Sequence, residues 1–309
     1  MAETMATRQA YGKTLIELGE KYPQLVVMDA DLSKSTMTAE FGKTYPDRFF
    51  NMGIAEQNLY GAAAGLALSG KIVCASTFAM FATGRAFEII RNSIGYTGAN
   101  VKICATHAGI TVGEDGASHQ TFEDLALMRT IPGMTVVNPC DGVSAKKLLK
   151  QVVDMTGPAY VRLGRAAVPV FYDETAEIEL GRANVLRQGR DVTVIATGIM
   201  VAEAMMAASQ LAEEGIDVRV IDMHTIKPLD EEIIVKAAKE TGKIVTAEEH
   251  SVIGGLGSAV AEVLCQKCPA KMVMVGQQDT YGESGKPEEL KEKYGMTAED
   301  IVSAVREIY

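Results

Sequence analysis

The side chains best suited to chemistry lie in the first half of the chain. Glu56 stands near the start of a helix-like segment, "GIAEQNLYGAAAGLAL", whose small residues would let another subunit pack closely. Burial of a carboxyl group favours its protonated form, so Glu56 could share a proton with a ligand nitrogen. The same position also suits a carboxylate that only stabilises the N-terminus of a helix. Both interpretations stay open at the level of the residues.

The segment "ATHAGITVGEDGASHQ", residues 105–120, is a second candidate site. It follows the apolar run "VKICAT", has no helical period, and contains His107, Asp115 and His119. Imidazole and carboxyl groups can transfer protons or bind a substrate, although a lone histidine is often structural. The histidine spacing is not a zinc motif such as HExxH. The acids of "GEDG" would repel phosphate, so the segment is not a phosphate-binding loop.

Four further residues have simple alternative interpretations. Arg8 and Arg165 could each be a surface charge. Phe78 and Phe81 are spaced i and i+3, as expected for two residues on the core face of a helix. On residue type and spacing alone, none of these four residues predicts a function.

The elements that must position these residues alternate in type. Five apolar, β-branched runs indicate buried strands: "LVVMDA", "KIVCAS", "VKICAT", "MTVVNP" and "AYVRLG". Helical patterns separate them, and strands that are apolar throughout are buried on both faces, which predicts a parallel sheet between helices. The polar segments "DADLSKST", "STFAMFATGR", "THAGITVGEDGASHQ" and "RLGR" each follow a strand. We therefore expect them to converge on the edge formed by the carboxyl ends of the strands.

The alternation stops near Arg165 and restarts near residue 186. The sequence thus predicts an α/β protein with two doubly wound domains, residues 1–166 and 186–309. A linker at 167–185 joins them and includes an edge hairpin or short strand. In the second domain, "EEHSVIGGLGS" lacks the GxGxxG spacing of a dinucleotide site, so we interpret it as a packing turn.

Composition narrows the class of protein. The 309 residues carry a formal net charge of -10, which argues against nucleic acid or an anionic membrane as the main partner. We find no signal pattern and no apolar run long enough to cross a membrane. The five cysteines fit a reduced, cytoplasmic protein. Cys265 and Cys268 form a CxxC pair, but no second pair of zinc ligands lies nearby.

Three motifs resemble one family. "GIAEQN" at 53–58, "STF" at 76–78 and "THAGITVGEDGASHQTFEDLALMRTIPGMTV" at 106–136 resemble the pyrimidine-binding domain of transketolases. The region from about residue 186 resembles the transketolase C-terminal domain, so the resemblance covers nearly the whole chain. It implies thiamine diphosphate as the cofactor.

One expected motif is not found. Complete transketolases begin with a domain that binds Mg²⁺ and the cofactor diphosphate through a GDG…N motif, and this chain has no such motif. The resemblance therefore implies the C-terminal half of a split transketolase. An N-terminal transketolase subunit would carry the GDG…N motif and ligate Mg²⁺ (or Ca²⁺), so no metal ligand is expected here. Self-association into a dimer, within a heterotetramer, is also implied.

The resemblance assigns cofactor contacts residue by residue. Glu56 matches the glutamate that hydrogen-bonds the aminopyrimidine N1′ and drives activation of the cofactor. Phe78 and Phe81 match the aromatic residues beside the pyrimidine, and Asp31 matches an aspartate near the cofactor and the dimer contact. Gly84 takes the place of a third aromatic residue, which leaves part of the stacking surface open.

The resemblance also assigns substrate contacts. His119 matches a catalytic histidine near the reacting hydroxyl, and Asp115 matches the aspartate that reads the hydroxyl at C2 of the donor. The residues that match the sugar phosphate clamp are Arg8, Ser35, His107 and Arg165. Two guanidinium groups would give charge-assisted hydrogen bonds to phosphate oxygens.

The implied activity is reversible transfer of a two-carbon ketol unit from a ketose phosphate to an aldose phosphate, as in the pentose phosphate pathway. One alternative is the β subunit of the thiamine-dependent component of a 2-oxoacid dehydrogenase, which is expected to lack GEDGxxHQ and the phosphate clamp. A second is a 1-deoxyxylulose-5-phosphate-synthase-like half, which is normally one chain. A third is a scaffolding paralogue without chemistry, against which the intact Glu56 and histidines argue.

Overall fold

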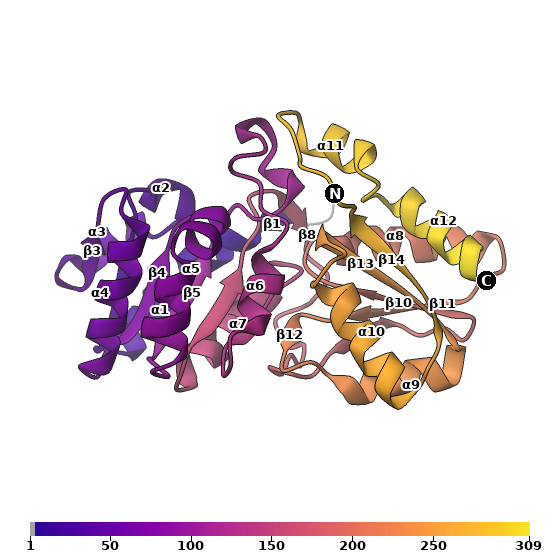
Figure 1. Cartoon of the computed structure of the whole chain (residues 1–309), viewed down its shortest axis with the longest axis horizontal. Coiled ribbons are helices and arrows are strands. Elements are labelled where there is room, and N and C mark those ends of the chain that lie inside the picture. The colour runs from indigo at the N-terminus through magenta and orange to yellow at the C-terminus, as the bar shows by residue number, and fades with distance from the viewer. Residues whose placement is uncertain (1–3) are drawn as a thin grey trace.

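The first half of the chain folds around a seven-stranded sheet (Figure 1). The computed structural model describes residues 4–309. The strand order is β12-β6-β7-β5-β4-β2-β3, and neighbours are parallel except for β12 against β6. The strands are β2 (Leu25–Asp29), β3 (Phe49–Asn51), β4 (Ile72–Ser76), β5 (Val101–Ala105), β6 (Thr135–Val137), β7 (Ala159–Arg162) and β12 (Thr225–Lys227).

Helices cover both faces of this sheet. The helical segments of this half are α1 (Thr7–Lys21), α2 (Ser33–Thr36), α3 (Ala39–Thr44), η1 (Pro46–Arg48), α4 (Glu56–Leu68), η2 (Phe81–Arg85), α5 (Phe87–Ile89), η3 (Ile90–Gly95), η4 (Ile110–Asp115), α6 (Asp124–Thr130) and α7 (Gly142–Asp154). Alternate residues of β2 enter different cores, with Val26 packing beside α4 and Val27 beside α1. The predicted parallel sheet between two helical layers is confirmed.

The second half is built on a five-stranded sheet of order β14-β13-β10-β11-β9, in which only β9 is antiparallel to its neighbour. Its strands are β9 (Asn184–Arg187), β10 (Val192–Ala196), β11 (Val218–Asp222), β13 (Lys243–Ser251) and β14 (Lys271–Gln277). Its helices are α8 (Met200–Glu213), α9 (Glu231–Thr241), α10 (Leu256–Lys267), α11 (Pro287–Lys293) and α12 (Ala298–Ile308).

Two strands cross the predicted domain boundaries. β12 comes from the second predicted domain but pairs with β6 at the edge of the first sheet. β8 (Ala167–Pro169) lies in the predicted linker and pairs with β1 (Thr4–Ala6). The division at residues 166 and 186 therefore stays a prediction, because backbone pairing ties the two halves together on both sides of it.

The glycine-rich segment differs from its predicted irregular form. Residues Ile110–Asp115 form a short 3₁₀ segment, η4, interrupted at Gly113, where φ is 79°. A residue with a side chain would be strained in this left-handed conformation. The helical pattern was hidden in the sequence because the segment is short and is broken by its glycine.

Candidate active site

Five candidate residues follow five adjacent strands of the first sheet. In sheet order, Arg165 follows β7, His107 follows β5, Phe78 follows β4, Asp31 follows β2 and Glu56 follows β3. Because these strands are parallel, all five residues lie at the edge formed by the carboxyl ends. The structure thus brings together residues that are up to 134 positions apart (165 − 31).

Arg8 reaches the same edge through the pairing of β1 with β8. Next to this pair, the backbone N–H of Gly164 donates a hydrogen bond to Thr7 Oγ1 at 2.8 Å. Burial, followed by the positive charge of Arg165, lowers the pKa of Arg8. Two like charges at one sheet edge favour an anionic ligand between them.

Ser35 is held beside Arg8 by a buried aspartate. Arg8 Nη1 donates to the backbone oxygen of Ser35 at 2.7 Å. Asp29 accepts from the backbone N–H of Leu32 at 2.6 Å and from the hydroxyl groups of Thr36 and Thr38 at 2.6 and 2.9 Å. These bonds fix the one-turn helix α2 that carries Ser35. Burial raises the pKa of Asp29.

His107 lies at the same sheet edge, just after β5. It is buried, and its φ of 57° turns the chain sharply after β5. Its ring lies 3.9 Å from the ring of Phe78, centroid to centroid, in a stacked arrangement. Burial, followed by the charges of Arg8 and Arg165, lowers the pKa of His107 to about 3. The imidazole is therefore neutral near pH 7, so it can both donate and accept a hydrogen bond.

The aromatic residues form one cluster with the second histidine. The rings of Phe78 and Phe81 are nearly parallel, at 17°, with their centroids 5.9 Å apart. The ring of His119 lies edge-on to Phe81 at 5.2 Å and to Phe78 at 6.2 Å. Phe78 is buried, whereas Phe81 is half-buried, so the pair is not simply part of the core.

Asp115 faces Arg165 across the mouth of the site. Arg165 Nη1 lies 3.9 Å from a carboxylate oxygen of Asp115 and 3.3 Å from one of Glu114, and it donates to the backbone oxygen of Val112. Asp31 is less closely tied to this group. Its carboxylate accepts from the side chain of Asn51 at 3.0 Å.

Glu56 is bound by a residue that the sequence did not single out. Its side chain is 2% exposed, and Nη1 of Arg85 lies 2.9 and 2.8 Å from its two carboxylate oxygens. The guanidinium carbon of Arg85 lies 4.8 Å from the ring centroid of Phe81. Glu56 and Phe81 therefore face the same space. Nothing in the sequence marks Arg85, because it meets Glu56 only through the fold.

Gly84, the predicted departure from the family aromatic, lies in the π-helical turn η2 beside Arg85. A Cβ atom at this position would overlap the terminal methyl group of Met80. Met80 thus occupies the space where a side chain of residue 84 would begin. Since the end of a methionine side chain is flexible, this space is adaptable rather than closed.

Two family models match the sequence of this chain. The model of the transketolase pyrimidine-binding domain matches residues 3–170, and that of the transketolase C-terminal domain matches residues 181–301. This chain belongs to the transketolase family. The resemblance inferred from the motifs is confirmed.

Individual relatives refine the assignment. The chain is 53% identical over 303 residues to a protein named as a transketolase C-terminal section from Methanocaldococcus jannaschii, covering 97% of this chain and 95% of the relative. It is 44% identical over 301 residues to the 6-deoxy-6-sulfo-D-fructose transketolase subunit SqwH of Clostridium sp. (strain MSTE9), covering 97% and 94%. A solved structure described as a split gene transketolase, inactive beta4 tetramer, matches with a TM-score of 0.93 and 57% identity over 98% of both chains. The chain is thus a transketolase subunit of the split type, corresponding to the C-terminal section.

In this transketolase subunit, the second domain holds the loop of residues 105–120 in place. Glu249, at the end of β13, accepts from both the backbone N–H and the hydroxyl of Thr111 at 2.7 Å. Gln120 Nε2 donates to the backbone oxygen of Glu283 at 2.9 Å. Figure 1 shows α11 beside the loop that carries η4. The loop holding Asp115 and His119 is therefore fixed at both ends by the second domain, a role that the sequence reading missed.

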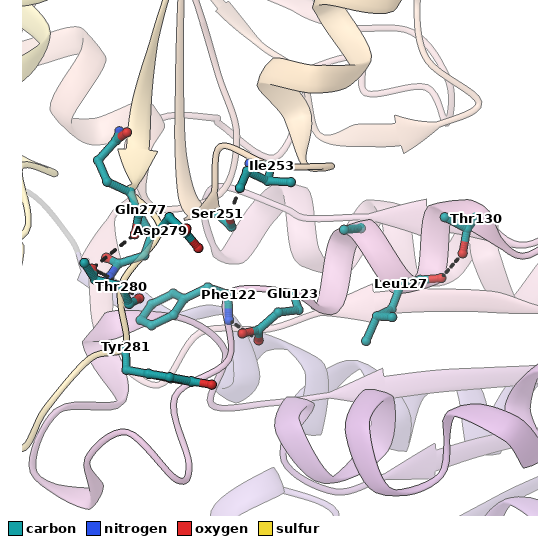
Figure 2. Close-up of a pocket in the computed structure, with 12 residues that line it drawn as sticks. Phe122, Glu123, Leu127, Thr130, Ser251, Ile253, Gln277, Asp279, Thr280 and Tyr281 are labelled. Atoms are coloured by element: carbon teal, nitrogen blue, oxygen red, sulfur yellow. Dashed lines mark hydrogen bonds between the residues drawn. The ribbon is translucent and has the colours of Figure 1, made fainter.

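A cavity of about 460 Å³ lies between the domains, behind this loop (Figure 2). Phe122 and Glu123 line it from the first domain, and Ser251, Ile253 and Tyr281 line it from the second. None of the candidate site residues lines this cavity, although Phe122, which does line it, is three residues after His119 in the chain. The cavity is thus separate from the candidate site at the sheet edge.

The described residues form neither a metal-binding cluster nor a membrane-spanning helix. Within residues 4–309, no group of three or more His, Cys, Asp or Glu side chains is arranged to hold a metal ion. No helix in that range is long and apolar enough to cross a membrane.

Proposed function

We propose that this chain supplies the pyrimidine-binding and sugar-binding half of a transketolase active site, which transfers a two-carbon ketol unit from a ketose phosphate to an aldose phosphate. The observation that carries the proposal is the arrangement of one sheet edge. A buried acid and two aromatic rings lie at one end, and two arginines with a neutral histidine lie at the other.

The acid and the aromatic rings suit the aminopyrimidine half of thiamine diphosphate. A flat heterocycle needs an aromatic face and a hydrogen-bonding partner in its plane, and Glu56 and Phe81 face one common space. When bound, the cofactor supplies a nucleophilic carbon and an electron sink. Glu56 would hold a proton at the pyrimidine N1′, while Phe78 and Phe81 would fix the plane of the ring.

The arginine end suits the distal phosphate of the sugar. Arg8 and Arg165 would each donate to phosphate oxygens, and the hydroxyl of Ser35 and the neutral imidazole of His107 would complete the clamp. Asp115 and His119 lie on the loop above and would contact the sugar hydroxyls. Binding the phosphate far from the reacting carbons helps to position them.

The proposed partner is an N-terminal transketolase subunit that carries the GDG…N motif and ligates Mg²⁺ (or Ca²⁺). The structural relative described as an inactive beta4 tetramer supports self-association of such subunits. All five cysteines have free thiols, which supports a cytoplasmic location.

The experiment combines this chain with a co-expressed N-terminal subunit, Mg²⁺ and thiamine diphosphate. We expect formation of sedoheptulose 7-phosphate from xylulose 5-phosphate and ribose 5-phosphate. A parallel reaction with 6-deoxy-6-sulfofructose as donor tests whether the clamp prefers a sulfonate, as the name of one relative suggests for that protein. A folded complex that binds cofactor but transfers no ketol unit from either donor would contradict the proposal.

A further inference from the structure

Arg85 occupies the space that Glu56 and Phe81 both face. Its Nη1 atom lies 2.9 and 2.8 Å from the two oxygens of Glu56. Its guanidinium carbon lies 4.8 Å from the ring centroid of Phe81. The guanidinium is planar, donates hydrogen bonds in its plane and stacks on aromatic rings. An aminopyrimidine would use the same acid and the same aromatic surface.

The local backbone explains how Arg85 reaches this place. Residues Phe81–Arg85 form a π-helical turn, η2, which contains one more residue per turn than an α-helix. Phe81 and Arg85 stand at the two ends of this turn, so both can face Glu56 at the start of α4. Gln57 Nε2 donates to the backbone oxygen of Arg85 at 3.4 Å. This contact ties the first turn of α4 to the end of η2.

The pairing of Arg85 with Glu56 stabilises the chain when no cofactor is bound. A buried carboxylate with no partner is strongly destabilising, and Glu56 is 2% exposed. Arg85 supplies the missing partner. Its own side chain is 49% exposed, and among the described residues its guanidinium donates hydrogen bonds only to Glu56. Stacking on Phe81 also holds the guanidinium, but the side chain is half-exposed, so it can swing into solvent when a ligand competes for both contacts.

We propose that Arg85 gates the cofactor site: it neutralises Glu56 and covers Phe81 while the site is empty, and thiamine diphosphate displaces it. This inference rests on the proposed role of Glu56 as the pyrimidine acid. The gate lowers the apparent affinity for the cofactor, because the ring can bind only when Arg85 has moved away. It also keeps the buried carboxylate of Glu56 paired with a cation before the cofactor binds.

The test measures cofactor binding by the complex with the N-terminal subunit. Isothermal titration calorimetry gives the Kd for thiamine diphosphate in the presence of Mg²⁺, for wild type, Arg85→Ala and Arg85→Lys. We expect the Kd of Arg85→Ala to fall about tenfold, as for a gate that leaves the site open in about one molecule in ten. Arg85→Lys keeps a cation near Glu56 and should stay close to wild type. Arg190→Ala is the control for loss of one positive charge, since Arg190 is exposed and lies in the second domain.

The isolated chain provides a second readout that needs neither cofactor nor activity. Arg85→Ala should lower its Tm by about 2–4 °C, because Glu56 loses its partner. Adding Glu56→Gln to that variant should restore most of the loss, because an amide tolerates burial better than a carboxylate. A Tm that does not respond to Arg85→Ala would show that the pair is not formed, and would overturn the inference.

The binding result separates this inference from the proposed function. If the wild-type complex does not bind thiamine diphosphate, the proposed function itself fails. If the complex binds it and Arg85→Ala leaves the Kd unchanged or raises it, Arg85 does not compete with the cofactor. In that case the gate is refuted while the function stands.

Discussion

The two sheets of this protein use their carboxyl edges in opposite ways. At the edge of the first sheet, charged groups such as Arg165 and Asp115 remain partly exposed at the mouth of a site. At the edge of the second sheet, the residues that end β13 are buried against the first domain. Both edges have the same architecture, so the topology alone does not decide which of them binds a ligand.

The second edge meets the first domain in a buried ion network. Arg162, from β7, lies 2.8 Å from Asp124 and 3.6 Å from Glu249, and all three side chains are buried. Burial opposes the charge of Arg162, but the two carboxylates hold its pKa above the ordinary value. His250 donates from Nδ1 to the backbone oxygen of Ser251 at 2.7 Å. Burial lowers its pKa, so it stays neutral.

Glu248 is also bound within the chain, at the N-terminus of a helix. Its two oxygens accept from the backbone N–H groups of Leu256 and Gly257 at 2.6 and 2.7 Å, at the N-terminus of α10. A helix N-terminus often binds an anionic ligand, but here a side chain of the same chain takes that position. The second edge therefore binds the first domain, whereas the first edge leaves Arg165 and Asp115 partly exposed. The following predictions probe this difference.

The largest effect is expected from Arg162→Ala, where the second edge meets the first domain. The change leaves Asp124 and Glu249 buried without their cation, so the free energy of unfolding should fall by about 3–5 kcal/mol. Urea denaturation of the isolated chain measures it. The exposed pair of Arg306 and Glu214 is the control, and Arg306→Ala should shift the urea midpoint far less than Arg162→Ala. Equal costs for the two variants would remove the contrast between buried and exposed ion pairs.

Glu56→Gln should have the next largest effect, on catalysis at the first edge. The amide cannot pass on a proton, so kcat of the assembled enzyme should fall about 10²–10³-fold. Size-exclusion chromatography should show that the subunits still assemble. Turnover within a few-fold of wild type, in a complex saturated with cofactor, would exclude the proton-holding role of Glu56.

Arg165→Ala should raise KM for phosphorylated substrates by about 10–100-fold, the value of one charge-assisted hydrogen bond. The KM for hydroxypyruvate, which has no phosphate, should change much less. Steady-state kinetics with both donors measures the ratio. An equal rise for both donors would mean that Arg165 supports the loop through Val112 and Glu114 rather than the phosphate.

The smallest effect is expected from His107→Asn and its pH dependence. The pKa of His107 is lowered from the ordinary histidine value of 6.5 to about 3 in the folded chain, so the unfolded chain binds more protons between these values. The stability that depends on neutral His107 is therefore present above pH 6.5 and is lost as the pH falls toward 3.

Between pH 8 and pH 5, wild type should lose about 1–2 kcal/mol relative to His107→Asn, which cannot be protonated. Urea melts of both proteins at the two pH values give this difference. From pH 6 to 8 the ratio of their KM values for sugar phosphates should stay constant, because His107 is neutral throughout. A ratio that titrates within that range would show that His107 carries a charge in the site.

Much of the fold was predictable because its signals are local. The apolar runs that become β2, β4, β5 and β7 are buried on both faces, and their composition shows it directly. The helix α12 was missed at the C-terminus, as was the short edge strand β3. A three-residue strand carries too little periodicity to be recognised.

The candidate site was only partly predictable. Glu56, His107 and His119 stood out by residue type and motif, and their roles remain predictions. Arg85 and Glu249 did not stand out, although one binds Glu56 and the other holds the substrate loop at Thr111. Their partners are 29 and 138 residues away in the chain, a separation at which no spacing rule applies.

The sequence by itself determined the family, the parallel sheets and the edge at which the polar segments gather, because apolar runs and the polar residues that follow them are neighbours in the chain. Only the tertiary structure decided which charged side chains stay accessible and which are buried in ion pairs. Arg162 and Arg165 lie three residues apart, yet one is locked between buried carboxylates and the other lies at the mouth of the site. That choice depends on what the second domain covers, since burial and charge pairing are set by contacts distant in sequence.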